Sequence, residues 1–208
     1  MTVAAPTARV VLLSGPSGAG KSRLAARLRA ERGWPIVRLD DFYRDEDDPA
    51  MPRSEELGIV DWDDPRSWNA DAALAALETL VRDGSTAVPV YDLSASRATG
   101  STHVVCDDGD LVLAEGIFAA ELVGMLRERD LLHRAYVVCR DRRLTFLLRL
   151  VRDLRERRKP PLVLLRRGMA LMRDEPRVVE RAVRLGGTVA SPGEVVADLG
   201  AANPATTD

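Results

Sequence analysis

Residues 15–22, GPSGAGKS, constrain the fold of this chain more than any other segment. They follow a continuously apolar run at residues 10–13 and precede a helical pattern at residues 21–32, so the segment joins a buried strand to a helix. Glycines at such a turn allow several backbone N–H groups to converge on one phosphate, and the start of the helix adds the positive end of its dipole. The segment matches G-x-x-x-x-G-K-[ST] at every fixed position, which predicts a nucleoside triphosphate site.

Lys21 is the residue of this segment that arginine cannot replace. The chain contains 28 arginines and two lysines, Lys21 and Lys159, so arginine supplies the cation almost everywhere else. A compact ammonium reaches the β- and γ-phosphates in a space that a planar guanidinium would fill differently. The hydroxyl of Ser22 is suited to Mg²⁺. The predicted nucleotide-binding residues are Gly15, Ser17, Gly18, Ala19, Gly20, Lys21, Ser22 and Arg23.

Short apolar runs alternate with longer helical patterns, which is typical of βαβ units around a parallel sheet. We expect core strands at residues 10–13, 35–40, 110–116 and 135–141. We expect helices at residues 21–32, 69–84 and 117–127, the second one capped by Asn69 and closed by Gly84. A small β-extension is expected from residues 87–92 and 103–106, with its loop at 95–101. The prediction is an α/β P-loop NTPase fold of three layers with a mainly parallel central sheet.

Length and charge indicate a single soluble domain. The 208 residues suit one domain, expected at residues 1–200 and followed by a disordered tail at 201–208. The formal net charge of −2 gives no overall attraction to nucleic acid or membranes. No long apolar segment of a signal peptide opens the sequence, and Cys106 and Cys139 lie in apolar runs without metal-type spacing. We therefore expect a cytoplasmic protein with two buried, reduced thiols, while its oligomeric state, a homo-oligomer included, stays open.

Two carboxylates follow apolar runs that are expected to end beside the phosphate-binding segment. Asp40 ends the strand expected at residues 35–40, and Glu115 ends the run LVLAE. Parallel sheets bind their ligands at such strand ends. Asp40 is suited to accept the proton of an attacking hydroxyl, and Glu115 together with Asp40 is suited to a Mg²⁺ ion or its water shell. Acids at strand ends can also simply face solvent, and Asp41 could exchange roles with Asp40.

The order of several further motifs resembles that of uridine–cytidine kinases. After the phosphate-binding segment come DDFYR (40–44), VDWDDPRSWN (60–69), VPVYD (88–92), AEGI (114–117) and an arginine-rich helix. The resemblance runs from about residue 10 to residue 167. It implies a kinase that uses ATP or GTP and Mg²⁺ to phosphorylate the 5′-hydroxyl of uridine or cytidine.

The resemblance assigns residues to the acceptor site. It implies that Asp40 is the catalytic base and that Asp63 binds the ribose hydroxyls. Tyr43 and Tyr91 match pocket aromatics of the family, and Trp62 stands where the family has phenylalanine. A nucleobase ring stacks favourably on such faces, so these three residues are expected to bind the acceptor.

The basic segment at residues 140–167 resembles the part of these kinases that closes over ATP, with the lid itself at about residues 155–167. By resemblance, Arg149 would contact the nucleoside ribose and Lys159 would lie near the base. Arg152 and Arg157 would neutralise charge on the transferred phosphoryl group, joining Lys21 and Asp40 in catalysis.

The chain departs from the family pattern at positions that contact the base. The stretch YDLSASR lacks the family's histidine, and Arg167 stands in place of a lid glutamine. A kinase of the same architecture for another acceptor, such as nicotinamide riboside or pantothenate, therefore stays open. Two other readings are a P-loop protein that binds nucleic acid or a partner through residues 140–167, which the acidic net charge disfavours, and a non-catalytic member of the family, which the intact phosphate and carboxylate residues disfavour.

Overall fold

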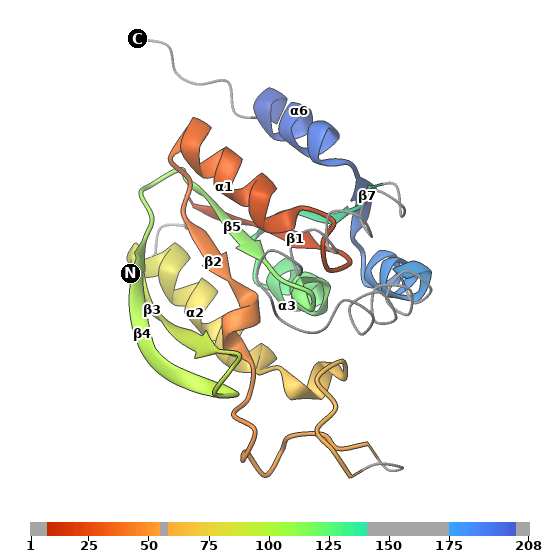
Figure 1. Ribbon diagram of the computed structural model, residues 1–208. Helices are drawn as coiled ribbons and strands as arrows, with labels where there is room; N and C mark the ends of the chain where they lie inside the picture. The colour runs from red at the N-terminus through yellow and green to blue at the C-terminus, as the bar shows by residue number, and fades with distance from the viewer. Residues whose placement is uncertain (1–7, 55–57, 141–174, 203–208) are drawn as a thin grey trace.

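The computed structural model describes residues 8–54, 58–140 and 175–202. Within these residues a five-stranded sheet forms the centre of the molecule, in the order β2-β5-β1-β6-β7 (Figure 1). All of its pairings are parallel. The strands are β1 (Arg9–Ser14), β2 (Ile36–Arg38), β5 (Leu111–Glu115), β6 (Leu132–Val138) and β7 (Thr188–Ala190). The predicted parallel sheet is confirmed.

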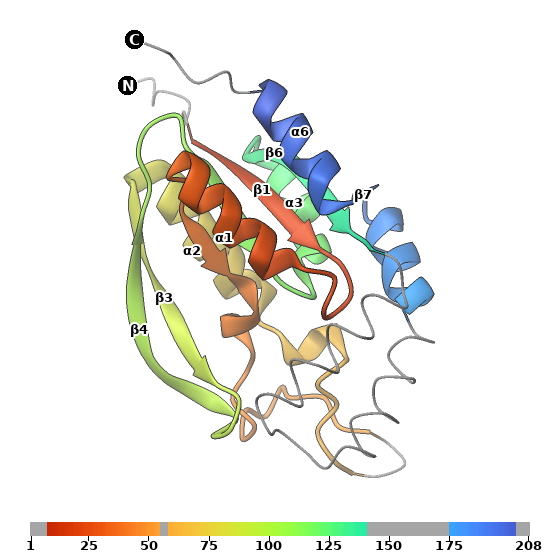
Figure 2. The ribbon, with the colours of Figure 1, turned by 45° about the horizontal axis from the view of Figure 1, so that its top comes forward.

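Helices cover both faces of this sheet and complete the three predicted layers (Figure 2). One face is covered by α1 (Lys21–Arg32) and α6 (Pro192–Ala202), and the other by α2 (Ala70–Asp83) and α3 (Val123–Glu128). Successive side chains of a strand point to opposite faces, so Val10 and Leu12 pack on the α2 side while Val11 and Leu13 pack on the α1 side. This two-sided burial explains why β1 is continuously apolar.

The predicted ends of the first two helices are confirmed by their capping contacts. The side chain of Asn69 accepts a hydrogen bond from the backbone N–H of Ala72 (3.0 Å) at the start of α2. Gly84 adopts the left-handed conformation (φ 76°) after α2, and Gly33 does the same (φ 80°) after α1. Only a residue without a β-carbon adopts this conformation freely, so glycine stops both helices.

The predicted β-extension is present, but its loop is shorter than expected. Strands β3 (Ser85–Asp92) and β4 (Arg97–Val105) form a separate antiparallel pair, joined by residues 93–96 rather than 95–101. The turn is made locally, because the carboxylate of Asp92 accepts hydrogen bonds from the backbone N–H groups of Ser94 and Ala95. The small polar residues that suggested a loop instead form the outer strand, which lies almost entirely exposed.

The structure differs from the sequence prediction in four further respects, which concern the bounds of some elements and the absence of others from the prediction. Strand β2 ends at Arg38, and Asp40 lies in the 3₁₀ helix η1 (Leu39–Phe42) that follows. The helix expected at 117–127 begins as the 3₁₀ helix η3 (Ala119–Leu122) and continues as α3. The helix at residues 175–184, together with β7 and α6, was not predicted, and α6 runs two residues into the expected tail.

Two global expectations can be compared with the structure. Cys106 is buried, Cys139 is partly exposed, and both are free thiols. Among the described helices, none combines the length and the apolar character needed to cross a membrane.

Candidate active site

The phosphate-binding loop leaves the end of β1 and leans against the end of β6. Gly15 has a φ of +128°, and a β-carbon at this position would lie 2.5 Å from the carbonyl oxygen of Val138. Gly18 and Gly20 also have positive φ, of 84° and 99°. These are conformations that side chains with a β-carbon rarely adopt. The backbone conformation therefore favours glycine at these three positions, and at Gly15 the contact with Val138 excludes a β-carbon as well. Neither requirement depends on a bound ligand.

Lys21 begins α1 and turns its ammonium group back onto this loop. Its Nζ donates hydrogen bonds to the carbonyl oxygens of Gly15 (2.8 Å) and Pro16 (3.2 Å), and its side chain is buried. The loop is closed further by a hydrogen bond from the N–H of Ala19 to the same Pro16 carbonyl (3.2 Å). Ala19 is buried, Ser17, Gly18 and Gly20 form the rest of the turn, and Ser22 and Arg23 lie exposed on the first turn of α1.

Glu115 lies next to this helix start, on the neighbouring strand. Strand β5 pairs with β1 so that Glu115 is opposite Leu13, and only 5% of its surface is exposed. Burial raises the pKa of this carboxyl, and the charge of Asp40 raises it further. The hydroxyl of Ser22 donates a hydrogen bond to Glu115, and this hydrogen bond lowers the pKa of the carboxyl. The positive charges of Lys21 and Arg38 lower it as well. The carboxylate is thus held among the lysine, the hydroxyl and the second acid.

Asp40 is positioned by the loop that follows Glu115. Its Oδ1 accepts a hydrogen bond from the backbone N–H of Ile117 (2.9 Å). A β-carbon on Gly116 would lie 2.8 Å from the same oxygen and 2.8 Å from the Leu39 side chain, so this residue must be glycine for Asp40 to approach. The motif AEGI therefore contains one acid of the site, Glu115, and the two residues that position the other acid, Asp40, namely Gly116 and Ile117.

Asp41 faces a different environment from Asp40. Its carboxylate lies 3.6 Å from the Nε of Arg38 and accepts a hydrogen bond from the backbone N–H of Tyr91. Burial raises the pKa of Asp41, while Arg38 and the Tyr91 hydrogen bond act in the opposite direction. Asp41 thus ties η1 to β3, and it is Asp40 that lies beside Glu115.

Four aromatic side chains gather next to Asp40. Tyr43 is central, with its ring centroid 5.7 Å from that of Trp62, 6.0 Å from Tyr91 and 6.0 Å from Phe118. The structure brings together the three aromatics predicted from the sequence. Phe118 was missed, although it directly follows the AEGI motif.

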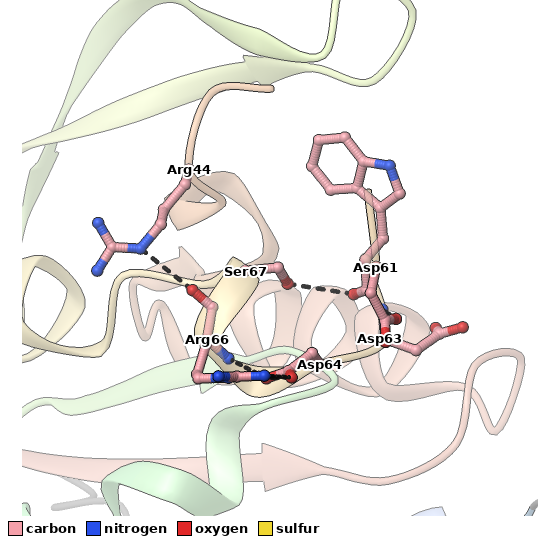
Figure 3. Close-up of polar contacts among 7 residues, drawn as sticks. Arg44, Asp61, Asp63, Asp64, Arg66 and Ser67 are labelled. Atoms are coloured by element: carbon pink, nitrogen blue, oxygen red, sulfur yellow. Dashed lines mark hydrogen bonds and ion pairs between the residues drawn. The ribbon is translucent and has the colours of Figure 1, made fainter. Parts of the chain in front are cut away.

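A network of polar contacts shapes the connection that carries Trp62 and Asp63 (Figure 3). Asp64 accepts a hydrogen bond from the backbone N–H of Arg66 (2.8 Å) at the start of the 3₁₀ helix η2 (Pro65–Ser67) and forms an ion pair with the Arg66 guanidinium (2.7 Å). Arg44 Nε donates to the Arg66 carbonyl (3.1 Å), and Ser67 Oγ donates to the Trp62 carbonyl (3.2 Å). The Asp63 carboxylate points away from the Asp64–Arg66 pair.

Comparison with known proteins identifies the family. Residues 10–161 match the phosphoribulokinase / uridine kinase family. The chain belongs to this family. Uridine kinase from Leuconostoc citreum is 31% identical over 153 residues, which cover 71% of this chain and 70% of the relative. Uridine kinase from Bacillus pumilus is 32% identical over 152 residues, covering 71% and 69%. The resemblance seen in the sequence is confirmed, and the family member is a phosphotransferase that acts on a hydroxyl group.

A solved structure shows the same fold. The crystal structure of a candidate fructose transport system kinase from Silicibacter sp. TM1040 superposes with a TM-score of 0.63, at 18% sequence identity, and covers 92% of this chain and 91% of that one. The P-loop kinase fold that we predicted for this family member is thereby confirmed.

The predicted arginines and the second lysine of this family kinase remain predictions. Arg149, Arg152, Arg157 and Lys159, with the lid at 155–167, lie outside the described residues.

A hollow of about 410 Å³ is lined by Arg44, Ala50, Pro65, Arg66, Trp68, Ala70, Asp71 and Glu121. None of these residues is among the predicted site residues, so the hollow is distinct from the P-loop and its carboxylates.

Proposed function

We propose that this protein is an ATP-dependent nucleoside kinase that phosphorylates the 5′-hydroxyl of uridine or cytidine. The observation that carries the proposal is the position of Tyr43. Burial raises the pKa of its hydroxyl, and the charges of Asp40 and Asp63 each raise it further. Tyr43 therefore lies near both Asp40, the carboxylate suited to act as base, and Asp63, the carboxylate expected to bind the ribose.

The donor would be held by the phosphate-binding loop and a divalent cation. Mg²⁺ prefers oxygen ligands and usually takes only one or two carboxylates besides phosphates and water. The Ser22 hydroxyl, Glu115 and the nearby Asp40 fit this ligand set. Among the described residues no group of three or more acidic, histidine or cysteine side chains gathers to hold a metal alone, so the nucleotide phosphates would complete the site. When bound, Mg²⁺ neutralises charge on the phosphate oxygens.

In the proposed reaction, the acceptor hydroxyl oxygen bonds to the γ-phosphorus of ATP. The bond from that phosphorus to the oxygen bridging it to the β-phosphate breaks, and ADP leaves. The hydroxyl proton passes to the carboxylate of Asp40, which the Ile117 N–H holds in place. Lys21 supplies the compact charge that offsets charge on the transferred group.

The aromatic residues of the acceptor pocket support a nucleoside as the acceptor. Tyr43, Trp62 and Tyr91 provide aromatic surfaces on which a base ring can stack. Neither histidine occupies the place of the family's base-contact residue. His103 is exposed on β4 opposite Ala87, and His133 lies near the start of β6.

The proposal is tested by measuring ADP release from ATP and Mg²⁺ with a panel of acceptors. The panel contains uridine, cytidine, purine nucleosides, nicotinamide riboside and pantothenate. Turnover with uridine or cytidine supports the proposal. Turnover with another compound alone would contradict the pyrimidine assignment and show that the acceptor has changed while the phosphate machinery is kept.

Asp63→Ala is expected to raise the KM for the ribose-containing acceptor by roughly 10-fold or more, because hydrogen bonds to a charged group are lost. The KM for ATP should stay within about twofold, since the charge of Asp63 acts on Tyr43 and Asp63 does not belong to the phosphate-binding loop. Asp47→Ala is the matched control, because Asp47 is an exposed acid of the same connection. Steady-state kinetics in both substrates decide the matter. A change confined to ATP would contradict the ribose role.

A further inference from the structure

We infer that Arg140 is a further donor-binding residue, which contacts the phosphates of the nucleoside triphosphate from the β6 side of the phosphate-binding loop. The inference rests on the proposed function in one respect, namely that the loop binds a nucleoside triphosphate. Arg140 is the first residue of the basic segment at residues 140–167, but the sequence analysis gave it no role of its own, because it stands just beyond strand β6 and outside the P-loop pattern.

Arg140 lies directly against the loop. Strand β6 pairs with β1, and the end of β6 touches the loop where Gly15 approaches Val138. Two residues after Val138, the guanidinium of Arg140 reaches Gly20. Its Nε lies 3.3 Å and its Nη2 lies 3.5 Å from the point where a β-carbon on Gly20 would be. Gly20 thus leaves the space beside the loop in which this guanidinium sits.

The charge of Arg140 has no counterpart in the part of the chain that the structure describes. Its Nε is buried and makes no hydrogen bond, and no acidic side chain there is recorded in an ion pair with it. A buried N–H group without an acceptor costs free energy, and more so when the group is charged. An arginine in this state beside a phosphate-binding loop is explained if the ligand supplies the acceptor.

The position of Arg140 favours the donor over the acceptor. In the sheet order, Glu115 ends β5 on one side of β1, and Arg140 follows β6 on the other side. Asp40 and the aromatic cluster lie on the β5 side. The guanidinium fork matches phosphate oxygens in two parallel hydrogen bonds, which makes arginine suited to a polyphosphate chain held between the two sides.

The experiment measures equilibrium binding of ATP and, separately, of inorganic tripolyphosphate, with the full chain and three variants. Arg140→Ala is expected to raise the Kd for both ligands by roughly 10-fold, because a charge-assisted hydrogen bond is lost. Arg140→Lys should recover part of the affinity by keeping the charge. Arg134→Ala is the matched control, since Arg134 is an exposed arginine on strand β6, which leads to Arg140, and its ion pair with Asp198 is long, at 3.8 Å. This control should bind both ligands like the wild type.

Thermal unfolding distinguishes a role of Arg140 in ligand binding from a purely structural role. Without ligand, Arg140→Ala should unfold at the wild-type temperature or above it, since it removes an unpartnered buried group. With saturating ATP it should show a smaller increase in Tm than the wild type, because the ligand stabilises the folded state less. A lower Tm without ligand combined with an unchanged increase on adding ATP would assign Arg140 to structure and overturn the inference.

The remaining outcomes separate this inference from the proposed function. If the wild type binds both ligands and Arg140→Ala binds them equally well, only the inference is overturned. If the variant loses affinity for ATP but not for tripolyphosphate, the guanidinium contacts the nucleoside part, and the phosphate assignment is wrong. If the wild type binds neither ligand, the proposed function fails and this inference fails with it.

Discussion

Lys21→Ala is expected to lower the rate of ADP release by at least about 10²- to 10³-fold, the range for removing one preorganised group that stabilises transition-state charge. The side chain is buried at the loop, where its Nζ already lies within hydrogen-bond reach of two carbonyl oxygens. Alanine removes the ammonium group that would meet the phosphates and its hydrogen bonds to the Gly15 and Pro16 carbonyls, of which the Pro16 carbonyl keeps the N–H of Ala19. The effect should therefore appear in kcat as well as in ATP affinity.

Lys21→Arg is the informative companion variant. It keeps the positive charge but places a larger planar group where the lysine is 7% exposed and the loop closes around it. We expect this variant to lose most of the activity too, because the guanidinium does not fit the space of an ammonium. The result would explain why a chain with 28 arginines and two lysines has lysine here.

Arg29→Ala serves as the control for both variants. Arg29 lies eight residues further along α1 with its side chain exposed and outside the predicted nucleotide-binding residues, so its loss should change kcat far less than the loss of Lys21. Circular dichroism and thermal unfolding establish that each variant is folded. Turnover of Lys21→Ala within a factor of two of the wild type would remove the phosphate role from this residue.

The parts of the fold that could be predicted are those specified by residues close together in the sequence. The loop that joins β1 to α1 is recognised from its glycines and its lysine, and α2 from Asn69 and Gly84 at its ends. The apolar residues of β1 and β5 indicate strands that are buried on both faces. Strand β7 and the outer part of β4 escaped prediction because β7 is three residues long and β4 is exposed along nearly all its length.

Most members of the candidate site could be predicted, but Phe118 and the detailed arrangement of the site could not. Parallel strands end at one edge of the sheet, so the meeting of Asp40 and Glu115 followed from topology alone. Whether Asp40 or Asp41 faces Glu115 depends on a hydrogen bond to Ile117, 77 residues away. Arg140 depends in the same way on the pairing of β6 with β1. Contacts between residues so far apart in the sequence follow from tertiary packing, which neighbouring residues in the sequence do not specify.

The separation of Asp40 from Asp41 leads to the second large expected effect. Asp40→Asn should lower kcat by about 10²- to 10⁴-fold, the usual contribution of a general base, because an amide cannot accept the proton of the acceptor hydroxyl. The amide oxygen can still accept the Ile117 N–H, so the position of the side chain is preserved. The Kd for ATP should change much less than kcat. Asp41→Asn is the matched control, since its partners are Arg38 and the Tyr91 backbone and not Glu115.

Gly116→Ala tests the same assignment without touching either acid. The new β-carbon would come within 2.8 Å of the Asp40 oxygen. The Asp40 carboxylate would therefore have to move away from the Ile117 N–H. A displacement of the base should lower kcat in the direction of Asp40→Asn while the phosphate-binding loop is unchanged. Rapid-quench kinetics on the three variants distinguish the chemical step from product release. If Asp41→Asn slowed that step more than Asp40→Asn did, the base would be Asp41, and the contact between Asp40 and Ile117 would be structural.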